Sequence, residues 1–149
     1  MALIDTREKI KMKNGDRFIL DFVSDIKTIS NTKGDVIKFS GTTNIELVEY
    51  YHNDELVYKT VIEYSSSNYI SRVIGYNNVN EILFNVSLDV FSSSVIIKDN
   101  LTNYVVRYLL SSAKVINIKT GYGTYYQRGS TLNIEYFDYK TKITNDLGE

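Results

Sequence analysis

The stretch from Glu81 to Val90 alternates between apolar and mostly polar side chains. Its even-numbered positions carry the apolar residues Ile82, Phe84, Val86, Leu88 and Val90. Successive side chains of a β-strand point to opposite faces, so this period of two predicts a half-buried strand. An α-helix would scatter the same residues around its circumference. We therefore expect the fold to be organised around extended strands from this stretch onward.

The residues that follow repeat the alternating pattern. Residues 95–99 (VIIKD) and 104–110 (YVVRYLL) flank the turn residues 100–103, which predicts a hairpin. Residues 113–120 (AKVINIKT) predict another strand. In the segment 130–139 (STLNIEYFDY), apolar and polar positions alternate again, so we expect a closing strand there.

The first half of the chain contains similar segments. Asn14-Gly15 lies between two alternating runs, and this pair tolerates the positive φ angles of a type I′ turn, so residues 10–23 predict a hairpin. Residues 24–34 predict a short strand or loop that ends in a turn at Lys33-Gly34, and residues 35–40 predict a strand. Residues 69–76 (YISRVIGY) predict a further strand.

One segment is ambiguous between strand and helix. Asn53-Asp54 supports a hairpin within residues 44–64, but the spacing of the apolar residues in 44–60 also fits a helix. The β-branched and aromatic content favours strands. If the chain contains a helix, we expect it within 44–60 or near 67–80.

Composition agrees with an all-β fold. The chain has 13 Tyr and 6 Phe but no Pro, and Ala occurs only at Ala2 and Ala113. Aromatic and β-branched residues fit a pleated sheet, whereas Ala is the best helix former. Short strands at intervals of roughly 8–12 residues predict an antiparallel β-sandwich or barrel, which can include one short helix. We expect one domain over 1–149, with an N-terminal arm (1–9) and a polar C-terminal tail (140–149).

Charge and composition exclude several classes of function. The 17 basic and 18 acidic residues give a net charge of −1, which argues against general electrostatic binding to nucleic acid. The absence of cysteine excludes disulfides and thiolate metal sites, and a single histidine excludes a histidine cluster. No apolar run is long enough for a membrane helix, and residues 1–11 lack a signal-peptide core. We expect a soluble chain made in the cytoplasm, without metal, cofactor or membrane partner.

Candidate catalytic residues are few. His52 could act with Asp54 and a serine of 65–67, but no GxSxG nucleophile elbow accompanies them, so a solvated histidine at a hairpin tip is favoured. Four carboxylates could supply the pair of acids of a glycosidase, but their polar neighbours in the sequence favour a solvent-exposed acidic surface. These carboxylates are Glu46, Glu49, Glu55 and Glu63. The stretch 120–129 (TGYGTYYQRG) lacks the GxGxxG order of a phosphate loop, so a mobile loop is favoured. The sequence thus predicts no enzyme activity and no catalytic residues.

Tyrosines are the residues best suited to contact another molecule. Tyr104 and Tyr108 share a face with Val106, so we expect them to be core or half-core residues rather than contact residues. Tyr125 and Tyr126 precede Arg128 in a loop, and exposed Tyr and Arg are enriched at interface hot spots. We therefore expect a contact surface that includes these three residues and Tyr122.

The second half of the chain resembles phage tail tube proteins and their relatives in contractile injection systems. The similar features are the hairpin at 95–115, the following loop, and the strand 130–141 with a polar tail. Residues 15–41 (GDRFILDF followed by DIKTISNTKGDVIKFSG) show a weaker similarity to the way in which such tubes run a first strand into an extended hairpin or loop.

This resemblance implies a structural virion protein that assembles into stacked rings, six subunits to a ring. Strand edges would be completed by neighbouring subunits, and loops 24–34 and 121–130 would join successive rings. Contact residues would then include Lys27 and Lys33. Partners would be further copies and other tail or baseplate proteins, with DNA only as passing cargo. The alternative from another class is a monomeric β-sandwich that binds carbohydrate on Tyr122, Tyr125 and Tyr126.

Overall fold

The structure is a computed structural model that describes residues 8–11, 17–21 and 26–149. These residues form 13 strands, with turns and bends between them and no helix. The prediction of an antiparallel all-β fold is confirmed. Neither region in which a helix was considered, 44–60 or 67–80, contains one. The chain divides into two compact units, one made of residues 1–63 and 74–83 and the other of residues 64–73 and 84–149.

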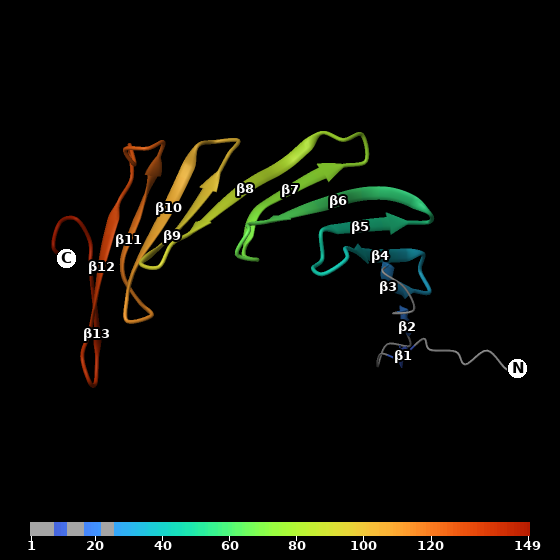
Figure 1. Cartoon of the computed structure of the whole chain (residues 1–149), viewed down its shortest axis with the longest axis horizontal. Helices are drawn as coiled ribbons and strands as arrows, with labels where there is room; N and C mark the ends of the chain where they lie inside the picture. Colours follow the sequence, from blue (N-terminus) through green and yellow to red (C-terminus); the bar gives the residue numbers. More distant parts are fainter. Residues whose placement is uncertain (1–7, 12–16, 22–25) are drawn as a thin grey trace, which may run out of the picture. The chain divides into compact units, whose positions relative to one another are not determined.

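The first unit carries six strands in chain order, each antiparallel to the next (Figure 1). They are β1 (Glu8–Lys11), β2 (Arg17–Asp21), β3 (Ile26–Asn31), β4 (Asp35–Ser40), β5 (Leu47–His52) and β6 (Glu55–Tyr64). The predicted hairpin of β5 and β6 is confirmed: Asn53 and Asp54 both have positive φ, 49° and 66°, as a two-residue type I′ turn requires. The Asn14-Gly15 turn lies outside the described residues, although β1 and β2 on either side of it pair as predicted.

The second unit also carries its strands in chain order. They are β8 (Ile82–Val90), β9 (Ser94–Asp99), β10 (Tyr104–Ser111), β11 (Lys114–Tyr122), β12 (Thr131–Tyr136) and β13 (Thr141–Thr144). The strand β7 (Ile70–Asn77) is divided between the two units, and the first two residues of β8 belong to the first unit. The predicted hairpin at 95–110 is confirmed. The expected closing strand ends at Tyr136, where the chain turns and pairs back as β13. Part of the segment expected as a tail, 140–149, is therefore a strand.

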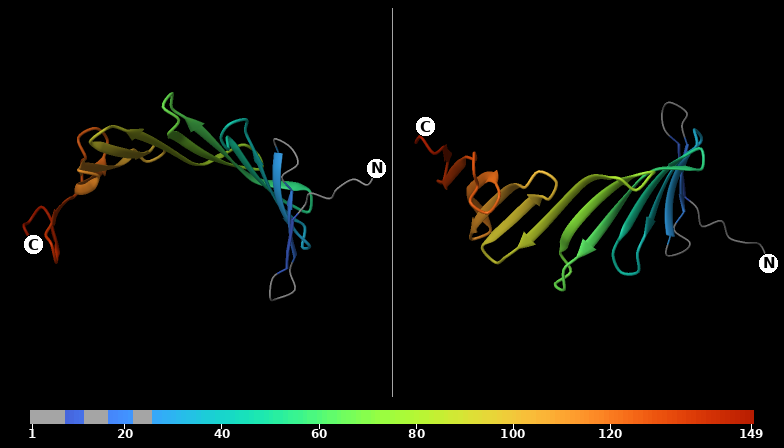
Figure 2. Two further views of the ribbon diagram at one scale, coloured as in Figure 1. Left: turned by 60° about the horizontal axis from the view of Figure 1, so that its bottom comes forward. Right: turned by 90° about the horizontal axis from the view of Figure 1, so that it is seen from above.

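Each unit is a single layer of strands. In the part of the chain that the structure describes, no pairing joins β1 to β6 or β8 to β13, so neither run of strands closes into a barrel. The strand contacts recorded within each unit, for the residues that the structure describes, are between neighbours in the sheet. Figure 2 shows the same arrangement from two further directions: within each unit, no further strand lies over either face. A layer that covers these faces must therefore come from outside the unit itself.

The two faces of the second unit differ in chemistry. Cross-strand partners lie on the same face, so the register defines continuous rows across the sheet. One row consists of Val90, Val95, Tyr108, Ile118 and Leu132, and the next of Leu88, Ile97, Val106 and Thr120. We call the side that holds these rows the apolar face. The opposite side, the polar face, holds Asp89, Lys98, Arg107, Lys119 and Asn133.

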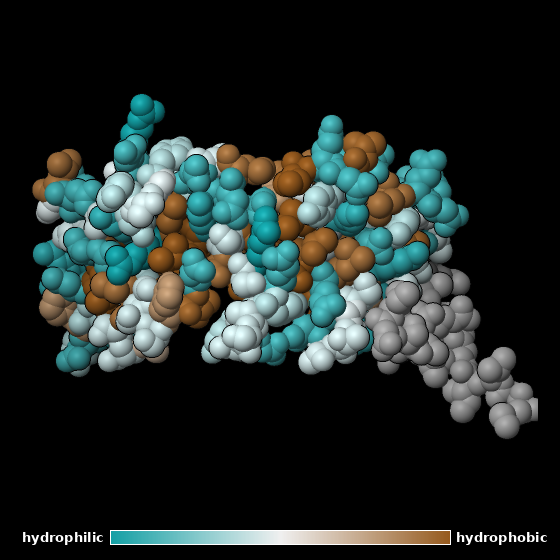
Figure 3. Space-filling model, turned by 45° about the horizontal axis from the view of Figure 1, so that its top comes forward, coloured by the Kyte–Doolittle hydropathy of each residue, from teal (hydrophilic) through white to brown (hydrophobic). Residues whose placement is uncertain are grey.

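Burial does not follow this division. Among residues 27–149, the buried apolar side chains are Ile74 and Val105, and Val105 belongs to the polar face. Residues of the apolar face are half-buried or exposed. Figure 3 shows apolar side chains at the surface of the molecule, among hydrophilic ones. The second unit therefore does not bury its apolar face with its own strands.

Candidate functional site

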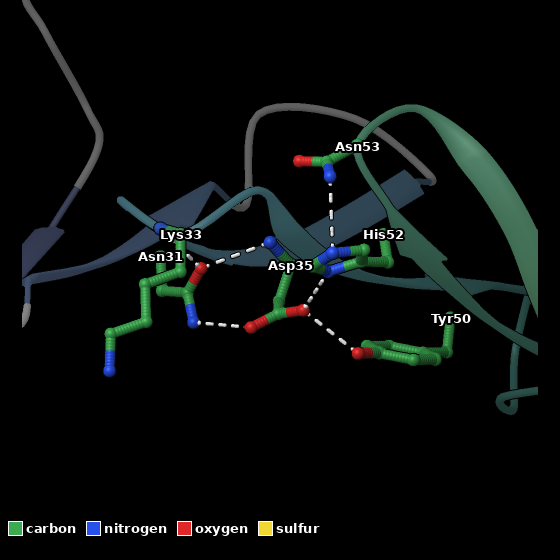
Figure 4. Close-up of polar contacts among 6 residues, drawn as sticks. All are labelled: Asn31, Lys33, Asp35, Tyr50, His52 and Asn53. Atoms are coloured by element: carbon green, nitrogen blue, oxygen red, sulfur yellow. Dashed lines mark hydrogen bonds and ion pairs between the residues drawn. The ribbon is translucent and has the colours of Figure 1, made fainter.

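A cluster of polar side chains joins two turns of the first unit (Figure 4). Asp35 begins β4, and the register places it opposite His52 at the end of β5. Oδ1 of Asp35 lies 2.8 Å from Nδ1 of His52 and accepts a hydrogen bond of 2.8 Å from the Tyr50 hydroxyl. Oδ2 accepts a hydrogen bond of 2.8 Å from the Asn31 side-chain amide. Three neighbouring strands thus meet at one carboxylate.

The surrounding backbone shows what this cluster does. The amide oxygen of Asn31 accepts hydrogen bonds from the backbone N–H groups of Lys33 (2.9 Å) and Asp35 (3.0 Å). The backbone N–H of Asn53 donates to the carbonyl of Gly34 across a distance of 2.9 Å. These bonds fix the β3–β4 turn against the β5–β6 turn. The cluster therefore has a structural role: the partners of the Asp35 side chain are Asn31 at the end of β3 and Tyr50 and His52 in β5.

Hydrogen bonds within the cluster shift the pKa values of Asp35 and Tyr50. The hydrogen bond from His52, followed by those from Asn31 and Tyr50, lowers the pKa of Asp35 from 3.8 to about 2. The hydrogen bond to the same carboxylate raises the pKa of Tyr50. Asp35 is therefore ionised at all but strongly acidic pH.

The pKa of Asp35 predicts a pH-dependent loss of stability. Because its pKa is lower in the folded state than in the unfolded state, the stabilisation is complete above about pH 4 and disappears as the pH falls toward 2. We expect Asp35→Asn to lower the melting temperature at pH 7 and to reduce its fall between pH 4 and 2. Circular dichroism melts from pH 2 to 7 measure this. Asp54→Asn is the control, and equal pH profiles for both variants would contradict the prediction.

The structure does not assemble the catalytic groups considered from the sequence. His52 pairs with Asp35 rather than with Asp54, and its other ring nitrogen, Nε2, lies 3.1 Å from the side-chain nitrogen of Asn53. The serines of 65–67 belong to the other unit. Asp35 was not among the candidate residues predicted from the sequence. Its position directly after the predicted Lys33-Gly34 turn is the sequence feature that could have indicated it.

The carboxylates of the first unit do not form a glycosidase pair. Glu49 lies opposite Lys38 on one neighbouring strand and Lys59 on the other, and it accepts a hydrogen bond of 3.1 Å from Tyr51. Glu55 lies opposite His52 at the end of the hairpin. Glu46 lies just before β5, where its carbonyl accepts a hydrogen bond of 2.8 Å from the backbone N–H of Ile62. Within the described ranges, no three His, Cys, Asp or Glu side chains gather closely enough to hold a metal ion.

The loop at 121–130 is held by backbone hydrogen bonds. Tyr122 and Gln127 exchange two such bonds of 2.9 Å, and Gly123 donates one of 2.8 Å to the carbonyl of Asn103. Tyr126 and Arg128 adopt positive φ angles of 53° and 52°. The segment expected as a mobile loop is thus a folded corner attached to the neighbouring β9–β10 turn.

This corner separates the three tyrosines that were expected to act together. Tyr122 lies opposite Tyr104, and their rings pack edge to face with centroids 5.2 Å apart, on the side of Val106. Tyr126 lies near Val105 of the polar face, with Nζ of Lys119 4.9 Å from its ring centroid. Tyr125 is 85% exposed. The three rings therefore do not form one platform.

The two lysines expected at subunit contacts belong to the first unit. Lys27 is exposed, but it lies in strand β3, opposite Phe39, and not in a loop. Lys33 lies in the turn that follows β3, as predicted. Tyr122, Tyr125 and Arg128 belong to the other unit.

Comparisons with known proteins identify no relative. No family model, curated protein or solved structure matches the chain. The described part of the chain contains no helix that is long and apolar enough to cross a membrane. The function must therefore be inferred from the residues and their arrangement.

Proposed function

We propose that this chain is a structural virion protein, a subunit of a phage tail or baseplate, and that it works by assembling with copies of itself rather than by catalysis. The observation that supports self-assembly is the apolar face of the second unit. It spans the six strands β8–β13, and the unit supplies no second layer for it. A sheet with one apolar face is stable in water only when another layer covers that face.

The size of the apolar face fits a subunit interface. Six of its side chains are 36–57% exposed: Phe84, Val90, Tyr122, Leu132, Tyr136 and Ile143. With areas of roughly 150–200 Å² per side chain, these six expose roughly 400–500 Å². The half-buried side chains of the face add to this area and bring it toward the ~800 Å² that each partner buries in a standard stable interface.

The charge of this face favours a second copy as the partner. In the described register from β8 to β13, Asp99 is the only acidic residue on the apolar face. Asp99 accepts hydrogen bonds from the Leu101 N–H (2.9 Å) and the Thr102 hydroxyl (2.6 Å), so the turn that follows β9 already satisfies its carboxylate. Lys114 also reaches this side of the sheet, with its Nζ 5.1 Å from the ring centroid of Tyr136. Over the rest of the face, two copies can meet without burying an unpaired charge.

The resemblance to tail tube proteins supplies the biological setting of this proposal. In that setting the copies form rings, six subunits to a ring, and further tail or baseplate proteins are the other partners. Strand edges such as that of β13 would add contacts between copies by β-augmentation. DNA would pass through the assembly without being a ligand, and the subunit would be made in the host cytoplasm.

Molar mass in solution tests the proposal. We expect size-exclusion chromatography with light scattering to show a mass that rises above 17.1 kDa with protein concentration, and negative-stain electron microscopy to show regular particles. A mass of one chain at every concentration up to the millimolar range would refute it. The same result would indicate that the apolar face is covered within a single molecule.

A further inference from the structure

A pocket of about 470 Å³ lies on the polar face of the second unit. Ile96 of β9 and Val105 of β10 contribute its apolar surface, and Val105 is only 7% exposed. Small-molecule pockets typically have volumes of roughly 300–1,000 Å³ and combine apolar walls with a few convergent polar groups. This pocket has both the size and the apolar surface that such a site needs.

The corner at 121–130 supplies an aromatic wall. Tyr126 lines the pocket, and its backbone has a φ of 53°, a conformation that costs free energy for a residue with a side chain. The backbone of Tyr126 packs so closely on Gly121 that a Cβ atom on Gly121 would overlap the Tyr126 carbonyl. The bond from Gly123 to the Asn103 carbonyl joins two walls of the pocket. The aromatic wall is therefore formed before any ligand arrives.

The polar groups of the pocket include both hydrogen-bond donors and acceptors. Asp89 supplies a carboxylate, Lys98 an ammonium group, Asn103 an amide and Thr124 a hydroxyl. A second ammonium group lies beside the aromatic wall, because Nζ of Lys119 is 4.9 Å from the ring centroid of Tyr126. Together these groups can donate and accept hydrogen bonds at several points of a ligand with many hydroxyl groups.

We infer that this pocket binds a saccharide. A sugar ring has an apolar C–H face that packs on an aromatic ring, and its hydroxyl groups need both donors and acceptors. Tyr126 supplies the ring, and Asp89, Lys98, Asn103 and Thr124 supply the donors and acceptors. This site does not rest on the proposed assembly, because Tyr126 and Val105 belong to the face opposite the one that would be covered by a second copy.

Binding of the whole chain to an array of immobilised mono- and oligosaccharides tests the inference, followed by calorimetric titration of the best soluble glycan. We expect Tyr126→Asn to weaken binding at least about tenfold, since one stacked ring is lost. Asparagine tolerates positive φ, so this variant keeps the backbone of the corner. Asp89→Asn, at an exposed position, should also weaken binding. Tyr125→Ala is the matched control and should leave the affinity within about twofold of the unmodified chain.

Two results would overturn the inference. One is an array on which no glycan binds the folded chain. The other is binding that survives Tyr126→Asn, which would place the glycan elsewhere. Light scattering of the same variants separates this question from assembly: Tyr126→Asn should leave the molar mass unchanged, whether or not the chain forms oligomers.

Discussion

Replacing Leu132 with lysine is expected to convert the assembled protein into single chains. Leu132 is 36% exposed in one subunit and lies in the row of Tyr108 and Ile118, on the apolar face. In a free subunit, a lysine at this position can extend into water. In an assembly that covers the face, its charge would be buried without a partner.

The expected effect is large because the one acid of this face, Asp99, is already bonded to the turn that follows β9. An uncompensated buried charge costs roughly 3–5 kcal/mol, which raises the dissociation constant roughly 100-fold or more. Sedimentation velocity over a range of concentrations measures this change. Asn133→Lys is the matched control, since Asn133 is the next residue of β12 and is exposed on the polar face, opposite Asn117. Oligomers of equal stability for both variants would refute self-assembly through the apolar face.

Much of the apolar face could be predicted from the sequence. The alternation of Phe84, Val86, Leu88 and Val90 predicts a strand with one apolar side, and the turn at 100–103 sets the next two strands side by side. Alternation does not say what covers an apolar side, because burial depends on a second layer and not on the strand itself. The sequence therefore predicted a sandwich or barrel, whereas each unit presents one open layer of strands.

The sequence did not predict the positions at which the burial or direction of a side chain departs from the alternating pattern. Val105 is buried although it lies on the polar face, and it lines the same pocket as Tyr126 of the folded corner. Tyr122 and Tyr126 are near in sequence, but Tyr122 ends a strand and Tyr126 follows a bend at Gly123. Their rings therefore go to different faces. Such an outcome depends on individual φ angles, which composition and periodicity do not contain.

The polar cluster on β3–β5 illustrates the same limit. The single histidine was identified as a residue at a hairpin tip, and it lies at the end of β5, next to the turn. Its partner Asp35 is 17 residues away in sequence, and only the register of β4 with β5 brings the two together. A one-residue change of that register would move Asp35 to the other face. Sequence patterns rarely fix register across such a distance.

The closure of the 121–130 corner depends on Gly129. A Cβ atom at this position would overlap the carbonyl oxygen of Thr120 on β11. The neighbouring backbone pairs the Thr120 N–H with the Ser130 carbonyl at 2.9 Å, and Tyr122 with Gln127. Main-chain atoms cannot move aside as a flexible side chain can, so any larger residue at 129 must push the corner away from β11.

We expect Gly129→Ala to lower the free energy of unfolding by roughly 2–4 kcal/mol, because three backbone hydrogen bonds are strained or lost at once. Urea unfolding followed by circular dichroism, at one fixed protein concentration, measures the loss. Gly123→Ala is the matched control: Gly123 has a φ of 66° but open space where a Cβ would go, so only the backbone penalty of roughly 1–2 kcal/mol applies. The Gly129 variant should also lose saccharide binding, since Tyr126 moves with the corner. A Gly129 variant as stable as the Gly123 variant would show that the corner is not held against β11 as the structure places it.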